Sequence, residues 1–116
     1  MLKFNKRVEF ILPEYTNDLV ALDHQEIIEK LASAFGGATV TTNKGYWSDN
    51  SILYIDNNIN IECFYNGFTN EISKAVEEVL LYGFTSCEQL ALTVKLNGQG
   101  FILDSIDDIN TLKSLL

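Results

Sequence analysis

The middle of the chain, residues 38–65, reads ATVTTNKGYWSDNSILYIDNNINIECFY. β-Branched and aromatic residues, which favour strands, fill both ends of this stretch. Between them, Ser48-Asp-Asn-Ser51 has the composition of a turn. The stretch therefore predicts a long β-hairpin with strands near Ala38–Trp47 and Ile52–Tyr65. Asp56-Asn-Asn58 interrupts the alternation of the second strand, and we expect a β-bulge there because the alternation resumes at once.

A helix is expected before this hairpin. Apolar residues recur at three- and four-residue steps over Asp18–Phe35, which is the pattern of an amphipathic helix. Asp18 or Asp23 is the expected N-cap, because a short carboxylate accepts the free N–H groups of a first helical turn. Gly36-Gly37 is expected to end the helix, since glycine adopts the left-handed conformation of a C-terminus without strain.

The remaining elements follow from the same kinds of pattern. A second amphipathic stretch predicts a helix over Asn70–Tyr82, closed by Gly83. Strands are expected at Arg7–Leu12, Gln89–Leu96 and Gln99–Leu103, with a tight turn at Asn97-Gly98 and a short C-terminal helix over Ser105–Leu116. The order strand, helix, strand, strand, helix, strand predicts a ferredoxin-like α+β fold. We expect one domain over residues 1–116, an antiparallel sheet with two helices on one face, an extra hairpin and the terminal helix.

Composition and charge exclude several classes of protein. The chain has 116 residues, with 8 Lys and Arg against 16 Asp and Glu, and a formal charge of −8. Nucleic-acid binding depends on basic side chains that neutralise phosphates, so we expect no direct nucleic-acid binding. The N-terminus lacks the apolar segment of a signal peptide, and no apolar run is long enough to span a membrane. The expected location is the cytoplasm, without membrane attachment.

The cysteines and the single histidine do not form a metal motif. Cys63 and Cys87 lie far apart, and His24 has no Cys-x-x-Cys partner. We interpret both cysteines as small core residues of a protein in a reducing compartment. No metal site and no cofactor are expected.

Candidates for acid–base catalysis are few. His24 has Asp23 and Glu26 close by in the sequence, but no serine or cysteine motif accompanies it. The adjacent pairs Glu77-Glu78 and Asp107-Asp108 cannot share one site, because neighbours on a helix point about 100° apart. No catalytic residue is assigned.

One aromatic cluster stands out as a candidate binding site. Lys44, Tyr46 and Trp47, the only tryptophan, lie near the tip of the expected hairpin. Tyr54 and Tyr65 lie on the strand expected to face them. Aromatic rings next to a lysine stack on a base and meet its phosphate, so these five residues are the predicted ligand- or partner-binding residues. The alternative is that Trp47 packs over the open face of the sheet or against a second copy of the chain.

Three short motifs resemble a family of small uncharacterised proteins of phages and mobile elements. They are Phe35-Gly-Gly-Ala-Thr39, Gly45-Tyr-Trp47 and the strand that contains Leu53-Tyr54. The resemblance implies no activity and no site residues. It implies a context, because small accessory proteins of mobile elements often bind host defence machinery or its signals. For a phage-encoded chain, the location would be the host cytoplasm.

These observations lead to one functional hypothesis with two alternatives. The hypothesis is a non-enzymatic binding protein that inhibits or sequesters a host defence component, either a protein surface or a small nucleotide signal. The first alternative is an enzyme acting on a small molecule, with His24 or a carboxylate as general base. The second alternative is a structural or regulatory dimer. A bare sheet face needs a cover, so we expect a homo-oligomer, with a dimer as the simplest case.

Overall fold

A computed structural model describes all residues, 1–116. Five strands form one antiparallel sheet in the order β2-β3-β1-β4-β5, and three helices accompany it. The elements are β1 (Lys6–Pro13), α1 (Gln25–Phe35), β2 (Thr39–Asp49), β3 (Ile52–Tyr65), α2 (Asn70–Phe84), β4 (Leu92–Leu96), β5 (Gln99–Leu103) and α3 (Asp108–Lys113). This is the predicted α+β arrangement, in which β5 extends one edge of the ferredoxin-like sheet.

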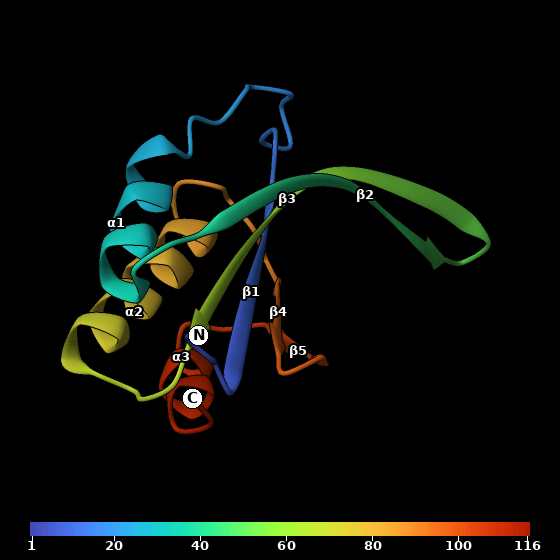
Figure 1. Ribbon diagram of the computed structural model, residues 1–116. Helices are drawn as coiled ribbons and strands as arrows, with labels where there is room; N and C mark the ends of the chain where they lie inside the picture. The colour runs from blue at the N-terminus through green and yellow to red at the C-terminus, as the bar shows by residue number, and fades with distance from the viewer.

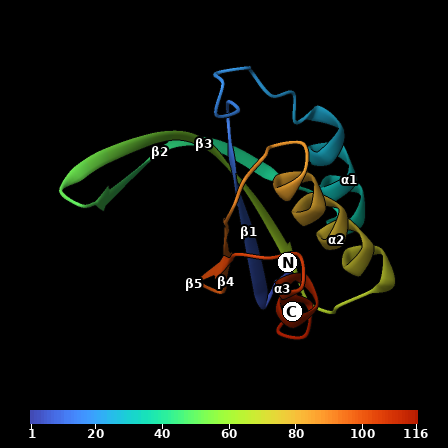
Figure 2. The same cartoon turned by 180° about the vertical axis from the view of Figure 1, so that it is seen from behind.

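The centre of the sheet is β1, which pairs with β3 on one side and β4 on the other. Val8, Phe10 and Leu12 alternate along β1 and are almost completely buried, because they face the helices. Figures 1 and 2 show α1 and α2 side by side on this one face, with α3 at the lower end. The core therefore lies between the sheet and the helices, and the opposite face of the sheet has no helical cover.

The start of α1 differs from the prediction. The helix begins at Gln25, and His24 is the residue at its N-cap position. The preceding segment turns tightly, with Leu19 at φ 62° and 81% exposed, so its apolar residues are not part of a helical stripe. The Asp23 carboxylate nevertheless accepts a hydrogen bond from the N–H of Gln25 at 3.0 Å. At the other end, Gly36 terminates the helix in the left-handed conformation, as predicted.

The ends of α2 are also displaced from their predicted positions. The cap is Thr69, whose hydroxyl accepts a hydrogen bond from the N–H of Ile72 at 3.2 Å. The helix continues through Gly83 to Phe84. A Cβ at Gly83 would lie 2.7 Å from a methyl group of Leu92, so this glycine provides close packing against β4. It does not end the helix.

The hairpin of β2 and β3 is regular over its whole length. Asn50 and Ser51 form its turn, both with positive φ, as a two-residue type I′ turn requires. Every residue from Thr39 to Asp49 has a partner on β3. The predicted bulge at Asp56-Asn-Asn58 is therefore wrong, because these residues pair in unbroken register with Gly45, Lys44 and Asn43.

The outer half of this hairpin, residues 43–58, is called the arm below. Figures 1 and 2 show that it extends well beyond the sheet and the helices. Tyr46, Leu53 and Ile55 on the arm are all more than half exposed.

The C-terminal third has shorter elements than predicted. β4 begins at Leu92, because Glu88 has a positive φ and the segment before β4 is a loop held to α2. The turn at Asn97-Gly98 is present as predicted, with both residues at positive φ. α3 comprises only Asp108–Lys113. None of the three helices has both the length and the apolar composition needed to cross a membrane.

Candidate functional site

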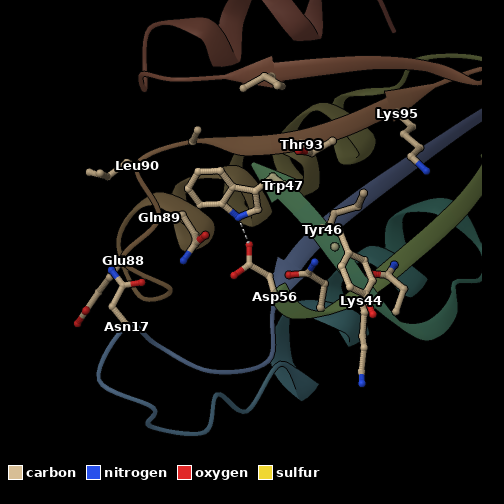
Figure 3. A pocket seen from close by; sticks show the side chains of 16 residues that line it. Asn17, Lys44, Tyr46, Trp47, Asp56, Glu88, Gln89, Leu90, Thr93 and Lys95 are labelled. Carbon is tan, nitrogen blue, oxygen red and sulfur yellow. Dashed lines mark hydrogen bonds between the residues drawn. The ribbon is translucent and has the colours of Figure 1, made fainter. Parts of the chain in front are cut away.

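The largest cavity lies on the side of the sheet without helices, where the arm, the sheet and two loops meet (Figure 3). Its volume is about 930 Å³, within the usual range for small-molecule sites. The arm contributes Asn43–Trp47, Asp56 and Asn58, the sheet contributes Ile11, Thr93, Lys95 and Ile102, and the loops contribute Asn17 and Glu88–Ala91. Segments far apart in the sequence thus build one site.

Trp47 is the central aromatic residue of this cavity. Its ring stacks on the ring of Tyr54, its cross-strand partner, with centroids 4.2 Å apart and planes 14° apart. Trp47 lines the cavity whereas Tyr54 does not. One face of the indole is therefore supported by Tyr54, and the ring is still 48% exposed. An indole held in this way is a ready platform for a flat ligand ring.

The same indole holds the Asp56 carboxylate in place. The Nε1–H of Trp47 donates a hydrogen bond to the Asp56 carboxylate at 2.9 Å, drawn as the dashed line in Figure 3. Asp56 pairs with Gly45, two residues before Trp47, so the regular register of the hairpin brings indole and carboxylate together. This places a negative charge beside the aromatic platform.

The absence of a side chain at Gly45 makes room for Asn58. A Cβ at Gly45 would lie 3.1 Å from the amide nitrogen of Asn58, which is tighter than an ordinary contact. The amide therefore lies across the β2 backbone at the floor of the cavity. Two lysines, Lys44 and Lys95, and two carboxylates, Asp56 and Glu88, complete the charged groups of the lining, so it carries no formal net charge.

The structure brings together most of the residues predicted from the aromatic cluster. Lys44, Tyr46 and Trp47 all belong to the lining, and Tyr54 supports Trp47 from behind. Alternation along β2 turns the side chains of Lys44 and Tyr46 to the face opposite that of Trp47, so Trp47 alone presents its ring to the open face. Tyr65 does not belong to the site. It is only 3% exposed and packs edge-on against Phe35 in the core, with ring centroids 5.6 Å apart. Its assignment to the binding cluster is wrong, because it points to the helical face of the sheet.

Several lining residues are not predicted by any pattern considered above. Asp56 and Asn58 belong to the stretch expected to form a bulge, although pairing outward from the turn at Asn50 places Asp56 beside Trp47. Glu88 and Gln89 come from a loop, and Lys95 comes from a strand on the other side of β1. No pattern in the sequence links these three residues to the arm.

His24 does not have the freedom of a general base. It is 8% exposed, and both ring nitrogens are occupied. Nδ1 lies 2.6 Å from the hydroxyl of Tyr82, and Nε2 lies 2.8 Å from the carbonyl oxygen of Pro13. Burial raises the pKa of the Tyr82 phenol well above its ordinary value, so this hydroxyl stays protonated. His24 therefore joins α1, α2 and the end of β1, and the hypothesis that it acts as a base is not supported.

The cysteines do not offer a nucleophile. Both are free thiols with no exposed surface. Burial raises the pKa of Cys63 to about 12 and that of Cys87 to about 11, so both remain protonated thiols at neutral pH. No group of three or more His, Cys, Asp or Glu side chains is arranged to hold a metal ion.

Comparisons with known proteins find similarity in structure alone. No family model and no curated protein matches the sequence. Among solved structures, a phage SAM lyase in complex with S-methyl-5'-thioadenosine matches with a TM-score of 0.59 and 9% identity. A phage SAM lyase in the apo state matches with a TM-score of 0.61 and 11% identity. Each match covers 90% of this chain and 95% of the other.

These matches show that the chain shares its fold with a small-molecule enzyme. The expectation of a non-enzymatic inhibitor, which rested on the missing catalytic motif, is contradicted by them. The matches favour the alternative of a small-molecule enzyme over that expectation. The resemblance to small phage and mobile-element proteins stays a prediction, since no family model tests it.

Proposed function

We propose that this chain is a small-molecule enzyme that binds S-adenosylmethionine (SAM) in the large cavity and cleaves it as a lyase. The observation that carries the proposal is the cavity itself, in which an aromatic platform and a carboxylate occur together in the fold of a phage SAM lyase. S-Methyl-5'-thioadenosine, present in one of the matched structures, is SAM without its four-carbon amino-acid chain. Cleavage between the sulfur and that chain would leave this molecule behind.

The aromatic platform suits the adenine ring. A purine stacked on the free face of Trp47 would continue the stack that Tyr54 begins. Stacking of a base on an aromatic side chain contributes roughly 1–3 kcal/mol. The cavity, at about 930 Å³, has room for a whole nucleoside with its sulfur substituents.

Asp56 suits the positive charge of the substrate. SAM carries a sulfonium cation, and the Asp56 carboxylate is held in place by the indole of Trp47. The sulfonium loses its charge as the carbon–sulfur bond breaks, so a carboxylate beside it binds the ground state better than the transition state. We therefore assign Asp56 to binding and orienting the substrate and to accepting the proton of an elimination. The carboxylate takes a proton from the carbon next to the one bonded to sulfur, the C–H electrons form a C=C bond, and the electron pair of the broken carbon–sulfur bond goes to sulfur. The chain then leaves as an unsaturated amino acid.

The direct test is turnover of SAM. Purified protein is incubated with SAM, and S-methyl-5'-thioadenosine is quantified by chromatography. We expect product with the wild type, a loss of at least tenfold in kcat/KM for Asp56→Asn, and a rise in KM for Trp47→Ala.

Two matched controls remove the same groups outside the cavity. Asp49→Asn changes another exposed carboxylate of the hairpin, and Phe68→Ala removes an exposed aromatic ring near α2. Both should keep wild-type turnover. If the wild type neither cleaves SAM nor binds S-methyl-5'-thioadenosine, the proposal is wrong.

We also propose that the chain forms a homo-oligomer through the arm. Tyr46, Leu53 and Ile55 share the face of the arm that continues the helical side of the sheet, and they are 62%, 62% and 53% exposed. A two-stranded ribbon with an apolar face is marginally stable when fully exposed to water, and a second copy of the chain would cover it. Native mass spectrometry should give the mass of two or more chains of 13.1 kDa each, and the mass of a single chain alone would contradict this proposal.

A further inference from the structure

β5 is an edge of the sheet that carries no protection against the addition of another strand. It pairs only with β4, and Figures 1 and 2 show no further element along its outer side. Natural edge strands are often protected by charged residues or proline, because their free N–H and C=O groups can pair with another chain. The sequence of β5, Gln99-Gly-Phe-Ile-Leu103, contains neither a charge nor a proline. This edge is therefore open to an extended segment.

The register of the hairpin shows which backbone groups of β5 are free. Asn97-Gly98 is a two-residue turn, so Leu96 and Gln99 on either side of it form a hydrogen-bonded pair. Hydrogen-bonded pairs alternate along an antiparallel ladder, so Gly100 and Ile102 direct their N–H and C=O groups away from β4. None of the backbone hydrogen bonds of loops and caps reaches these groups. Each of the two residues thus offers a donor and an acceptor to an incoming backbone.

A groove lies along this edge, between β5 and the C-terminal segment that contains α3. Its volume is about 290 Å³. Its apolar residues are Phe101, Ile102 and Leu103 of β5 and Leu112 and Leu115 of the C-terminal segment. Ile102 lies on the face of the strand opposite that of its two neighbours, so the groove reaches around the free edge. Ile102 and Leu115 are 74% and 51% exposed, and alternate side chains of an added strand would cover them.

The charged groups of the groove are all acidic. Asp104 and Asp108 line it, and no lysine or arginine does. The Oδ2 of Asp108 accepts a hydrogen bond from the N–H of Asp104 at 3.1 Å, which holds this carboxylate at the end of β5. The same hydrogen bond lowers the pKa of Asp108, so the group is ionised at neutral pH. Lys113, the only cation of α3, already pairs with Glu77 at 3.6 Å.

These charges favour one kind of occupant. A second copy of the chain would bring a further formal charge of −8 to an acidic groove. A segment with lysine or arginine would instead place opposite charges next to Asp104 and Asp108.

We propose that the edge of β5 binds an extended basic segment of another protein, which adds a sixth strand to the sheet. In an antiparallel addition the N-terminal end of the segment lies beside Asp104, so its basic residues belong there and apolar residues follow at alternate positions. Main-chain hydrogen bonds to Gly100 and Ile102 give affinity, and the groove with its carboxylates gives specificity. This inference rests on the sheet edge and is independent of the proposed enzyme activity.

The test uses two synthetic peptides of opposite charge. The first is acetyl-Lys-Lys-Val-Thr-Val-Thr-Val with fluorescein at its C-terminus, and the second has glutamate in place of both lysines. Binding is measured by fluorescence polarisation at low and at high salt. We expect the wild type to bind the lysine peptide at least tenfold more tightly than the glutamate peptide, and salt to reduce the difference.

A pair of variants at one position tests the backbone pairing. Gly100→Pro removes one of the free N–H groups, and proline is tolerated in an edge strand where its nitrogen faces solvent. Gly100→Ala keeps the N–H, and its Cβ would have no atom within 4 Å. The lysine peptide should bind Gly100→Pro at least tenfold more weakly than the wild type, and Gly100→Ala within twofold of it. Circular dichroism checks that both variants are folded.

Two further variants test the groove without changing a strand. Leu115→Arg places a cation in the groove at a residue that is 51% exposed, so the lysine peptide should bind at least tenfold more weakly. Val20→Arg adds the same charge at an exposed residue of the loop after β1 and should leave the affinity unchanged.

Three results would overturn the inference. The wild type binds the two peptides equally, or it binds neither, or the lysine peptide binds both Gly100→Pro and Leu115→Arg as tightly as the wild type. If the wild type binds neither peptide and Gly100→Pro lowers the number of chains seen by native mass spectrometry, the occupant of the edge is a second copy. None of these results changes the expected turnover of SAM, so the proposed function is tested separately.

Discussion

The two halves of β3 have the same sequence pattern and opposite surroundings. In the half that ends at Tyr65, Ile59, Ile61 and Cys63 are buried beneath the helices. In the half that belongs to the arm, Leu53 and Ile55 continue the same alternation on the same face of the strand, and both are more than half exposed. The two halves differ in exposure because α1 and α2 cover the sheet and do not reach the arm (Figures 1 and 2).

This comparison separates stability from function within one strand. Burial of the inner half removes apolar surface from water and stabilises the fold. The outer half contributes little to that core, and its aromatic and charged side chains remain available to a ligand or to a second copy. The predictions below test this division.

The largest effect is expected from the core. Phe10 is 1% exposed at the centre of β1, so Phe10→Ala should lower the free energy of unfolding by about 3–5 kcal/mol. Tyr46→Ala on the arm removes a ring that is 62% exposed in the monomer and should change the free energy of unfolding of the monomer by less than about 0.5 kcal/mol. Urea denaturation followed by circular dichroism measures both. Equal destabilisation by the two variants would mean that the arm is part of the folding core.

A smaller loss of stability is expected at His24. His24→Ala removes the hydrogen bonds of the ring to the Tyr82 hydroxyl and the Pro13 carbonyl oxygen. The Tyr82 hydroxyl keeps the carbonyl oxygen of Asp23 at 3.3 Å as a partner, so we expect a cost of about 1–3 kcal/mol for these half-buried groups. Gln25→Ala, the exposed neighbour, serves as control and should stay within about 0.5 kcal/mol of the wild type. Turnover of SAM per folded molecule should not change in either variant. A stable His24→Ala protein without turnover would show that His24 acts in catalysis after all.

Shortening the arm should separate binding from folding. Gly45 and Asp56 are cross-strand partners, so replacement of residues 46–55 by Asn-Gly closes the hairpin with a type I′ turn. At a protein concentration low enough for both proteins to be monomeric, the melting temperature should stay close to that of the wild type, because no core residue is removed. Affinity for S-methyl-5'-thioadenosine should fall about tenfold to a hundredfold, since the stacking platform is lost. Unchanged affinity would place the ligand elsewhere on the protein.

The fold was more predictable than the site, for reasons that particular residues make clear. The extent of the strand over Ile52–Tyr65 and the turn at Asn97-Gly98 depend on local chemistry, and both predictions are confirmed. The expected bulge at Asp56-Asn-Asn58 is the wrong prediction with the largest consequence for the site. One extra residue would reverse the face of every later side chain, whereas the regular register places Tyr54 and Tyr65 on opposite faces of β3. Membership of the same strand was therefore not enough to group them.

The rest of the site depends on contacts between distant segments. Glu88 and Gln89 reach the cavity because their loop, held to α2, runs past the base of the arm. Sequence patterns relate residues that are only a few positions apart, so they cannot predict such a contact. The predicted start of α1 is wrong for a related reason. Leu19, with its positive φ, belongs to a loop that is held to the arm by the hydrogen bond between Glu14 and Asn57.

The smallest expected effect concerns the buried thiols. Burial raises the pKa of Cys87 to about 11 and that of Cys63 to about 12, above the ordinary value of 9.0 that the unfolded chain would have. At a pH between 9.0 and the pKa of the native thiol, the native state keeps a proton that the unfolded state releases. The thiols therefore contribute full stability below pH 9, and this contribution is lost as the pH rises through 11 to 12. Each thiol should lower the free energy of unfolding by roughly 1 kcal/mol between pH 8 and pH 10.

A double variant isolates this contribution from that of the other titrating groups. Cys63→Ala with Cys87→Ala retains every lysine and tyrosine, so its free energy of unfolding should fall less steeply between pH 8 and pH 10 than that of the wild type. Urea denaturation at the two pH values measures both slopes. The native protein should also react slowly with a thiol reagent at pH 8 and rapidly in urea, because neither sulfur is exposed. The labelled residue is identified by mass spectrometry, because Cys87 lies outside β3. Rapid reaction of Cys63 in the native protein would mean that the inner half of β3 opens to water as readily as the arm, and the division between the two halves would no longer hold.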